Sequence, residues 1–121
     1  AIMAYIERDA ENAELLSQLS LALTTKYGIP VTIGFGPRFL HSTGQLHKGD
    51  GNHGLFLQIT QLTQDDLDIP GQNYSFGVLK EAQALGDWQA LESAKRRTMR
   101  IGVTGNLATE LAELAKNIKI L

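Results

Sequence analysis

Three histidines, a lysine and an arginine lie in one glycine-rich segment, residues 34–54, which reads GFGPRFLHSTGQLHKGDGNHG. The Lys48 ammonium can donate to a sugar oxygen or to a phosphate, and it can act as a general acid. Histidine is the side chain that most readily exchanges a proton near neutral pH, and His47 is adjacent to the lysine. The segment therefore predicts a polar ligand site with acid–base chemistry at Lys48 and His47.

The same segment offers further donors to a ligand. Ser42 and Thr43 bring hydroxyls and backbone amides to a predicted helix start, a place where anions bind. We expect these side chains to bind substrate: Arg38, His41, Ser42, Thr43 and Gln45. None of the glutamates is near this segment in sequence, so we expect no carboxylate base beside Lys48.

Two other ligand chemistries are disfavoured by spacing. His41, His47, Asp50 and His53 are six, three and three residues apart, whereas metal-binding histidines are usually four apart on a helix or two apart on a strand. The glycines at 34 and 36 lack the third glycine of a dinucleotide motif, and they favour a tight strand exit with close backbone approach. We therefore expect neither a metal nor an organic cofactor.

Composition narrows the class of partner. The 121 residues suffice for one domain with its own core, and 43% of them are hydrophobic. The net charge of −2 argues against nucleic acid or an anionic membrane as a partner. The chain has no cysteine and no apolar run of membrane-spanning length, so we expect a cytoplasmic protein without disulfides.

Four short apolar runs are typical of buried strands, at residues 2–6, 31–35, 55–60 and 99–103. Helical patterns lie between and after them. The first follows a cap at Asp9 and ends at Gly28, and the last follows Gly105 and Asn106. A helical turn is expected near residues 45–48 and a polar loop at 64–72.

Between the third and fourth strands we expect two helices rather than one. Ser75 is a typical cap for the first, and Gly86 would end it. Asp87 would then cap a second short helix, residues 88–95. The basic cluster Lys95, Arg96, Arg97 and Arg100 would follow as helix-end charges or a solvated face.

The alternation of strands and helices predicts an α/β fold. We expect a three-layer αβα sandwich in which helices cover both faces of a small, mostly parallel sheet of the doubly wound type. The chain opens directly in an apolar run and supplies only four strands. We therefore expect residues 1–121 to be a single domain and a part of a longer protein.

Two sequence phrases resemble a known family. The phrase FGPRFLHSTGQLHKG, residues 35–49, followed by GLFLQIT at 54–60, is similar to the C-terminal part of bifunctional transaldolase/glucose-6-phosphate isomerase proteins. The segments DIPG at 68–71 and YSFGVLKEAQALGD at 74–87 fit as well. Gln45 and Lys48 also match the C-terminal signature of the broader isomerase family.

The resemblance implies a sugar-isomerase (SIS) fold that binds a phosphosugar beyond the strand ends. It implies that Lys48 helps to open the sugar ring and that Gln45 helps to place the substrate. The family's glutamate base, its arginine and its phosphate-binding loop would lie upstream, as would the transaldolase barrel. The isolated fragment would then be inactive.

The expected function is thus aldose–ketose isomerisation of glucose 6-phosphate and fructose 6-phosphate, a step of glycolysis, gluconeogenesis and the pentose phosphate pathway. The expected partners are a phosphorylated sugar, upstream domains of the same polypeptide and further copies of the chain. An alternative is a non-catalytic phosphosugar-binding or domain-interface module. The sequence leaves open which histidine acts with Lys48.

Overall fold

The computed structural model describes residues 1–62 and 65–120. Four strands alternate with helices along the chain. The strands are β1 (Ile2–Tyr5), β2 (Ile33–Phe35), β3 (Leu55–Gln61) and β4 (Arg97–Val103). The helices are α1 (Ala10–Tyr27), the 3₁₀ turn η1 (Arg38–His41), α2 (Thr43–Lys48), α3 (Phe76–Ser93) and α4 (Leu107–Ile120).

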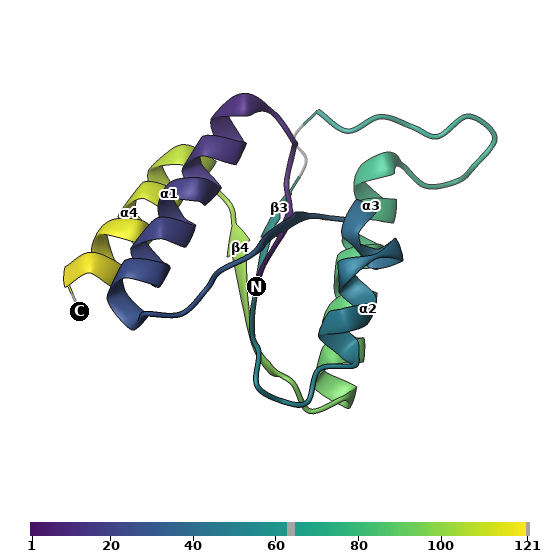
Figure 1. The fold of residues 1–121 in the computed structure, drawn as a ribbon. Coiled ribbons are helices and arrows are strands. Elements are labelled where there is room, and N and C mark those ends of the chain that lie inside the picture. The colour runs from purple at the N-terminus through teal and green to yellow at the C-terminus, as the bar shows by residue number, and fades with distance from the viewer. Residues whose placement is uncertain (63–64, 121) are drawn as a thin grey trace.

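The strands form one sheet in the order β2-β1-β3-β4, and every neighbouring pair is parallel. Figure 1 shows α1 and α4 on one face of the sheet and α2 with α3 on the other. The predicted αβα sandwich is therefore confirmed, and the four predicted strands are all present within two residues of their expected bounds. The chain crosses from β1 outward to β2 and then returns to the other side of β1, which makes the gap between β1 and β3 the point where strand order reverses.

The face under α1 and α4 is apolar. Ile2, Ala4 and Ile59 point from the central strands into a cluster that contains Leu16 and Leu19 of α1. The other buried members of this cluster come from the end of β1, the rest of α1, β4 and α4: Ile6, Ala22, Val103, Leu107, Leu111, Ala115 and Ile118. Successive strand residues point to opposite faces, so this one set of positions makes the larger core.

The caps of α1 are those that the sequence predicts. The Asp9 carboxylate accepts the Asn12 backbone N–H at 2.7 Å, which satisfies one of the free donors at the helix start. Gly28 ends the helix in the left-handed conformation, at φ 64°, and donates its N–H to the Thr24 carbonyl.

Helix α3 departs from the prediction of two helices. It runs without a break from Phe76 to Ser93, with Ser75 as its cap, and passes through both Gly86 and Asp87. Ala84, Asp87 and Leu91 are its buried residues, spaced so that they share one face toward the sheet. This continuous buried face outweighs the roughly 1 kcal/mol that an interior glycine costs a helix. Asp87 is thus a side chain of the interior and not a cap.

The link between β3 and α3 is the expected polar loop, although residues 63 and 64 lie outside the described part. Asp66 orders its second half, because its carboxylate accepts the backbone N–H of Gly77 at 2.7 Å and the hydroxyl of Ser75. An antiparallel bridge joins Asp68 to Ser75.

Close backbone approach is confirmed at Gly36. A Cβ at this position would lie 2.5 Å from the ring of Tyr5, so any side chain would displace the tyrosine. The Gly36 N–H donates to the Ala4 carbonyl at 2.8 Å, which keeps the chain against β1 as it leaves β2. The exit from β2 thereby directs the following segment, η1 and α2, over the face that carries Tyr5.

Candidate functional site

Lys48 lies at the end of α2 and faces α3. Its Nζ is 3.1 Å from Oδ1 of Asp87, and the two side chains are 27% and 1% exposed respectively. The sequence predicts no carboxylate base beside Lys48; the fold brings the carboxylate of Asp87, from the middle of α3, to the ammonium as an ion-pair partner. The only sequence signal for this ion pair is Asp87 itself, which faces the sheet when α3 is one continuous helix.

Asp87 has a second partner on the central strand. The Tyr5 hydroxyl donates to Asp87 Oδ2 at 3.3 Å, and Tyr5 is fully buried. Burial raises the pKa of the Tyr5 phenol, and the charge of Asp87 and the hydrogen bond to it raise that pKa further. Tyr5 therefore stays a neutral donor, and Asp87 receives one donor on each oxygen, which is what a buried carboxylate requires.

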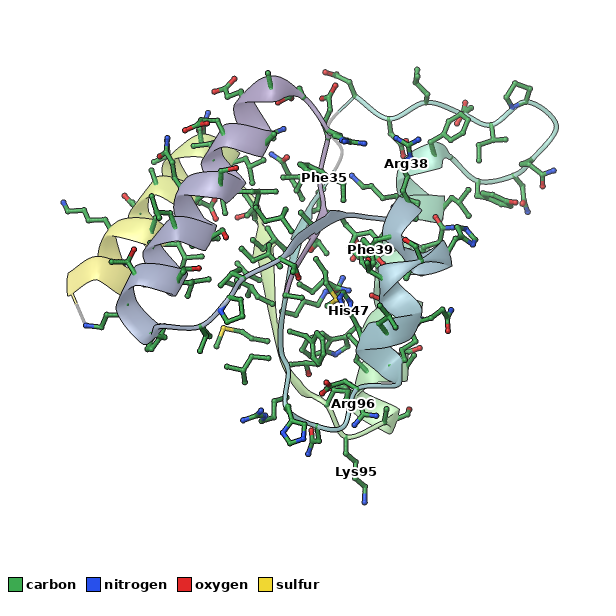
Figure 2. All side chains as sticks on the ribbon, in the orientation of Figure 1. Phe35, Arg38, Phe39, His47, Lys95 and Arg96 are labelled. Carbon is green, nitrogen blue, oxygen red and sulfur yellow. The ribbon has the colours of Figure 1, made fainter. Side chains whose placement is uncertain are left out.

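The backbone of Lys48 is held from the other side by Arg96. The guanidinium donates to the Lys48 carbonyl from Nε at 3.2 Å and from Nη2 at 2.8 Å. These bonds satisfy a carbonyl at the end of α2, where helical partners run out. Figure 2 shows Arg96 beneath α2, beyond the end of α3. Lys48 is thus fixed at both its ammonium and its backbone.

The remaining basic residues mostly serve local structure. Arg97 Nη2 donates to the carbonyl of His53 at 2.6 Å and to that of Asn52 at 3.3 Å, which ties the glycine-rich segment to β4. Arg100 pairs with Glu81 of α3. Lys95 is exposed and occupies the left-handed region at φ 56°, where α3 turns toward β4. Arg96, Arg97 and Arg100, which the sequence predicts to be helix-end charges or a solvated face, thus make contacts that hold neighbouring segments together.

His47 packs between two aromatic rings. Its ring centroid is 6.0 Å from that of Phe39 and 5.1 Å from that of Phe56, and Figure 2 shows it directed toward the sheet. Its Nδ1 is buried, and among the described residues it has no hydrogen-bond partner. Burial lowers the pKa of His47. The His47 imidazole is therefore neutral, and it lies between α2 and the sheet, close to the amino-terminal ends of the strands.

The five predicted substrate-binding residues lie on the exposed side of η1 and α2. They are Arg38, His41, Ser42, Thr43 and Gln45. The Ser42 hydroxyl donates to the Phe39 carbonyl at 3.4 Å and the Gln45 amide donates to the Leu40 carbonyl at 3.3 Å. Within residues 1–62 and 65–120, no hydrogen bond or ion pair between protein side chains joins these five to Lys48. Figure 2 shows Arg38 at the opposite end of this layer from Arg96.

Metal-ligating groups do not converge in the described part of the chain, where no set of three or more histidine, aspartate or glutamate side chains is placed to hold an ion. Asp50 instead accepts the Gly54 backbone N–H at 2.9 Å, and this bond lowers its pKa. The carboxylate thereby closes the turn that leads into β3.

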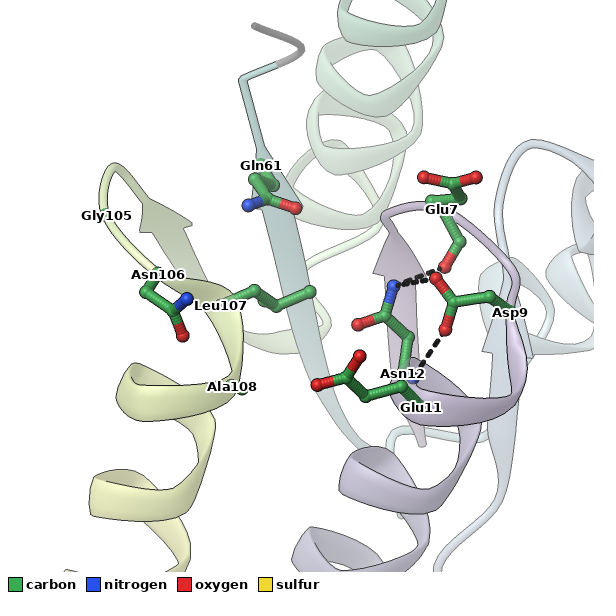
Figure 3. Close-up of a pocket in the computed structure, with 9 residues that line it drawn as sticks. All are labelled: Glu7, Asp9, Glu11, Asn12, Gln61, Gly105, Asn106, Leu107 and Ala108. Atoms are coloured by element: carbon green, nitrogen blue, oxygen red, sulfur yellow. Dashed lines mark hydrogen bonds between the residues drawn. The ribbon is translucent and has the colours of Figure 1, made fainter.

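A hollow of about 580 Å³ lies at the carboxyl ends of the strands, over the gap between β1 and β3 (Figure 3). Its lining is mostly polar and includes the three carboxylates of Glu7, Asp9 and Glu11. The other lining residues are Asn12, Gln61, Gly105, Asn106, Leu107 and Ala108. Ligands of doubly wound sheets bind at this place. None of the residues predicted for a ligand site lines this hollow, although a doubly wound sheet favours a site at the carboxyl ends of its strands. Lys48 and His47 are not among its lining residues, so the site expected beyond the strand ends does not include them.

Comparison with known proteins identifies the fold. No family model matches the chain, and no curated protein matches it. A crystal structure of a hypothetical protein from Thermus thermophilus is similar, with a TM-score of 0.84 and 17% sequence identity. The match covers 99% of this chain and 34% of that one, so this chain spans about a third of that protein. No helix within the described residues is both long and apolar enough to span a membrane.

Proposed function

We propose that this chain is the C-terminal SIS-type part of a phosphosugar isomerase, carried on a polypeptide that also bears a transaldolase domain. The observation that carries the proposal is the state of Lys48. The lysine that resembles the family's ring-opening residue has its ammonium fixed by a buried carboxylate, and 27% of its side chain is still exposed. A donor that is fixed in place and reachable is what catalysis by hydrogen bonding requires.

The reaction interconverts glucose 6-phosphate and fructose 6-phosphate. The cyclic sugar opens by breaking its bond between C1 and the ring oxygen, and a proton then moves between C2 and C1 through an enediol. Lys48 donates a hydrogen bond to the ring oxygen as charge develops on it, which favours the transition state over the bound sugar. The base that moves the carbon-bound proton is supplied by upstream segments of the polypeptide. Because that proton lies next to a carbonyl, neither metal nor organic cofactor is required.

The same proposal implies which molecules and domains this chain binds. The phosphorylated sugar and the upstream domains of the polypeptide meet this chain at the exposed side of α2, where Gln45, His41, Ser42, Thr43 and Arg38 supply contacts. Further copies of the chain are expected in the assembled cytoplasmic enzyme. Lys48 is not the Schiff-base lysine of the transaldolase, which belongs to a separate barrel.

The test uses the natural gene product that contains residues 1–121. In a coupled assay that converts fructose 6-phosphate, Lys48→Ala should lower kcat about a hundredfold or more, as expected for loss of one acid–base group. Lys48→Arg should restore little, because the guanidinium is larger and planar. Lys95→Ala, at an exposed position, is the matched control, and transaldolase activity should not change. Near wild-type kcat in Lys48→Ala would exclude Lys48 as the ring-opening donor.

The isolated 121 residues provide a second test. They supply donors without the isomerase base, so they should bind a phosphosugar weakly and not convert it. Turnover of roughly 10 per second or more, typical of a complete enzyme, would show that the base is within this chain.

A second candidate is a non-catalytic interface module, favoured by exposed apolar side chains beside the start of α3. Leu62, Leu67, Phe76 and Val78 are each more than half exposed. Apolar residues gathered in this way are typical of a surface that meets another domain. Under this alternative, Leu67→Ser with Phe76→Ser would weaken association with the rest of the polypeptide, while Lys48→Ala would leave the activity intact.

A further inference from the structure

The Lys48 ammonium is held by a chain of groups that begins in the centre of the sheet. Tyr5 is fully buried on β1, and its hydroxyl donates to Asp87 Oδ2 at 3.3 Å. The other oxygen of Asp87 is 3.1 Å from Lys48 Nζ. The three side chains come from β1, α3 and α2, so the contact links the sheet to both helices on this face of the molecule.

The burial of the three groups is graded. Tyr5 and Asp87 are 0% and 1% exposed, whereas Lys48 is 27% exposed. Solvent or a ligand can therefore reach the lysine and neither of the other two. A carboxylate removed from water in this way is costly unless a cation compensates it. Lys48 is the cation placed to do so, and its position is consequently tied to that of Asp87.

The remaining freedom of Lys48 is limited by its backbone. Arg96 donates two hydrogen bonds to the Lys48 carbonyl, at 3.2 and 2.8 Å. Gly49 closes the end of α2 by donating its N–H to the Gln45 carbonyl at 3.0 Å. An ordinary surface lysine has about 2 kcal/mol of rotamer entropy, and such fixing at both ends is unexpected for a solvated one.

We propose that Asp87 is a positioning residue for Lys48, anchored by Tyr5, and that it holds the ammonium in place on the exposed side of the contact between α2 and α3. Asp87 does not touch the substrate. It acts by reducing the number of positions that the ammonium samples, which raises the fraction of molecules ready to donate to the sugar.

Two experiments test this inference, and only the kinetic one rests on the proposed function. The structural experiment is reductive methylation of the lysines, with the rate at each site measured by mass spectrometry. In Asp87→Asn, Lys48 should be labelled about threefold or more faster than in the wild type, because a surface-reachable ion pair contributes modestly. Lys80, on α3 with Asp87, is the matched control and should be labelled at its wild-type rate.

A merely structural role for Asp87 gives a different pattern. Loosening of α3 would speed labelling of Lys80 and Lys48 together, and this outcome would overturn the proposal, as would an unchanged rate at Lys48. Tyr5→Phe keeps the carboxylate and removes one donor to it. This variant should speed labelling of Lys48 by a smaller factor than Asp87→Asn, and it keeps the proposal testable if Asp87→Asn does not fold. No change in Tyr5→Phe would remove Tyr5 as the anchor.

The kinetic experiment uses the complete enzyme. Asp87→Asn should lower isomerase kcat about tenfold or more while KM changes little, because the geometry of a donor is altered and not the binding of the sugar. Unchanged kcat would overturn the proposal. If the wild-type protein does not isomerise phosphosugars, the proposed function fails, and the labelling result still decides whether Asp87 positions Lys48.

Discussion

The same four strands present two different faces. Under α1 and α4, Ile2, Ala4 and Ile59 enter an apolar cluster. Under α2 and α3, the alternate residues Tyr5, Gln58 and Thr60 are buried beside Asp87 and a second, smaller apolar cluster, so this face is mixed. Because side chains alternate along a strand, neighbouring residues of β1 and β3 serve opposite purposes.

The two faces differ in their buried polar groups, because Gln58, Thr60 and Asp87 all lie on the mixed face. Apolar burial is favourable at about 25 cal/mol per Å² and needs no partner. A buried polar group needs one, and Gln58 illustrates the demand: its Nε2 donates to the Ala84 carbonyl at 2.9 Å, while its Oε1 has no partner among the described residues. The buried polar groups of the mixed face therefore need partners that the apolar face does not need, and Lys48 and His47 lie on the mixed side.

The largest effect that would sharpen this comparison is expected on the apolar face. Leu19→Ala, at a fully buried position of α1, should reduce the free energy of unfolding by about 2–5 kcal/mol, because it leaves a cavity in the core. Leu46→Ala is the matched control, since Leu46 is 72% exposed on α2. Urea unfolding measures both variants. Equal losses would mean that the apolar cluster is not the principal core.

The next effect is expected at Gly36, on the mixed face. Gly36→Ala should destabilise the protein by about 1–3 kcal/mol, because the new Cβ would lie 2.5 Å from the Tyr5 ring. Displacing that ring should also disturb the hydrogen bond from Tyr5 to Asp87. Thermal unfolding and the methylation rate of Lys48 measure the two consequences.

Gly86→Ala is the control for this substitution. Gly86 lies inside α3 and a Cβ there would meet open space, so the same change should stabilise the protein by about 0.5–1 kcal/mol. Opposite signs at the two glycines are expected. A neutral Gly36→Ala would contradict the close packing of the β2 exit against Tyr5.

The stability that comes from the mixed face should also depend on pH. Burial lowers the pKa of His47 below the value of 6.5 that the unfolded chain has. The unfolded state therefore binds this proton first as the pH falls through 6.5, so stability falls from that point down to the lowered folded pKa. His47→Leu should flatten the dependence of unfolding free energy on pH just below 6.5. His41→Leu, at an exposed position, should keep the wild-type dependence; an identical slope in both variants would contradict the burial of His47.

The smallest effect is expected at Gln58. Gln58→Met should change the free energy of unfolding by less than about 1 kcal/mol, because one hydrogen bond is lost and one unpaired buried oxygen is removed with it. Methionine is close to glutamine in length and fills the space. Gln58→Ala leaves a cavity and should cost more in the same denaturant titration. A loss in Gln58→Met as large as in Leu19→Ala would break the distinction between the two faces.

Much of the fold followed from local signals in the sequence. The strands at 2–5 and 55–61 are dense apolar runs, and the caps Asp9, Gly28 and Ser75 act through bonds to residues within four positions of themselves. Such bonds form wherever the local chain is helical, so a single sequence is enough to predict them. The glycine-rich segment was located in the same way, as a polar stretch between apolar runs.

Tertiary structure decided the length of α3 and which residues contact Lys48. Gly86 followed by Asp87 is locally a typical helix end and helix start, and only the packing of Ala84 and Leu91 against the sheet carries the helix through them. That continuity turns Asp87 inward, where β1 supplies Tyr5 and α2 supplies Lys48. Residues so distant in sequence meet because burying the apolar core lowers the free energy of the folded chain. A local sequence pattern contains no information about that burial.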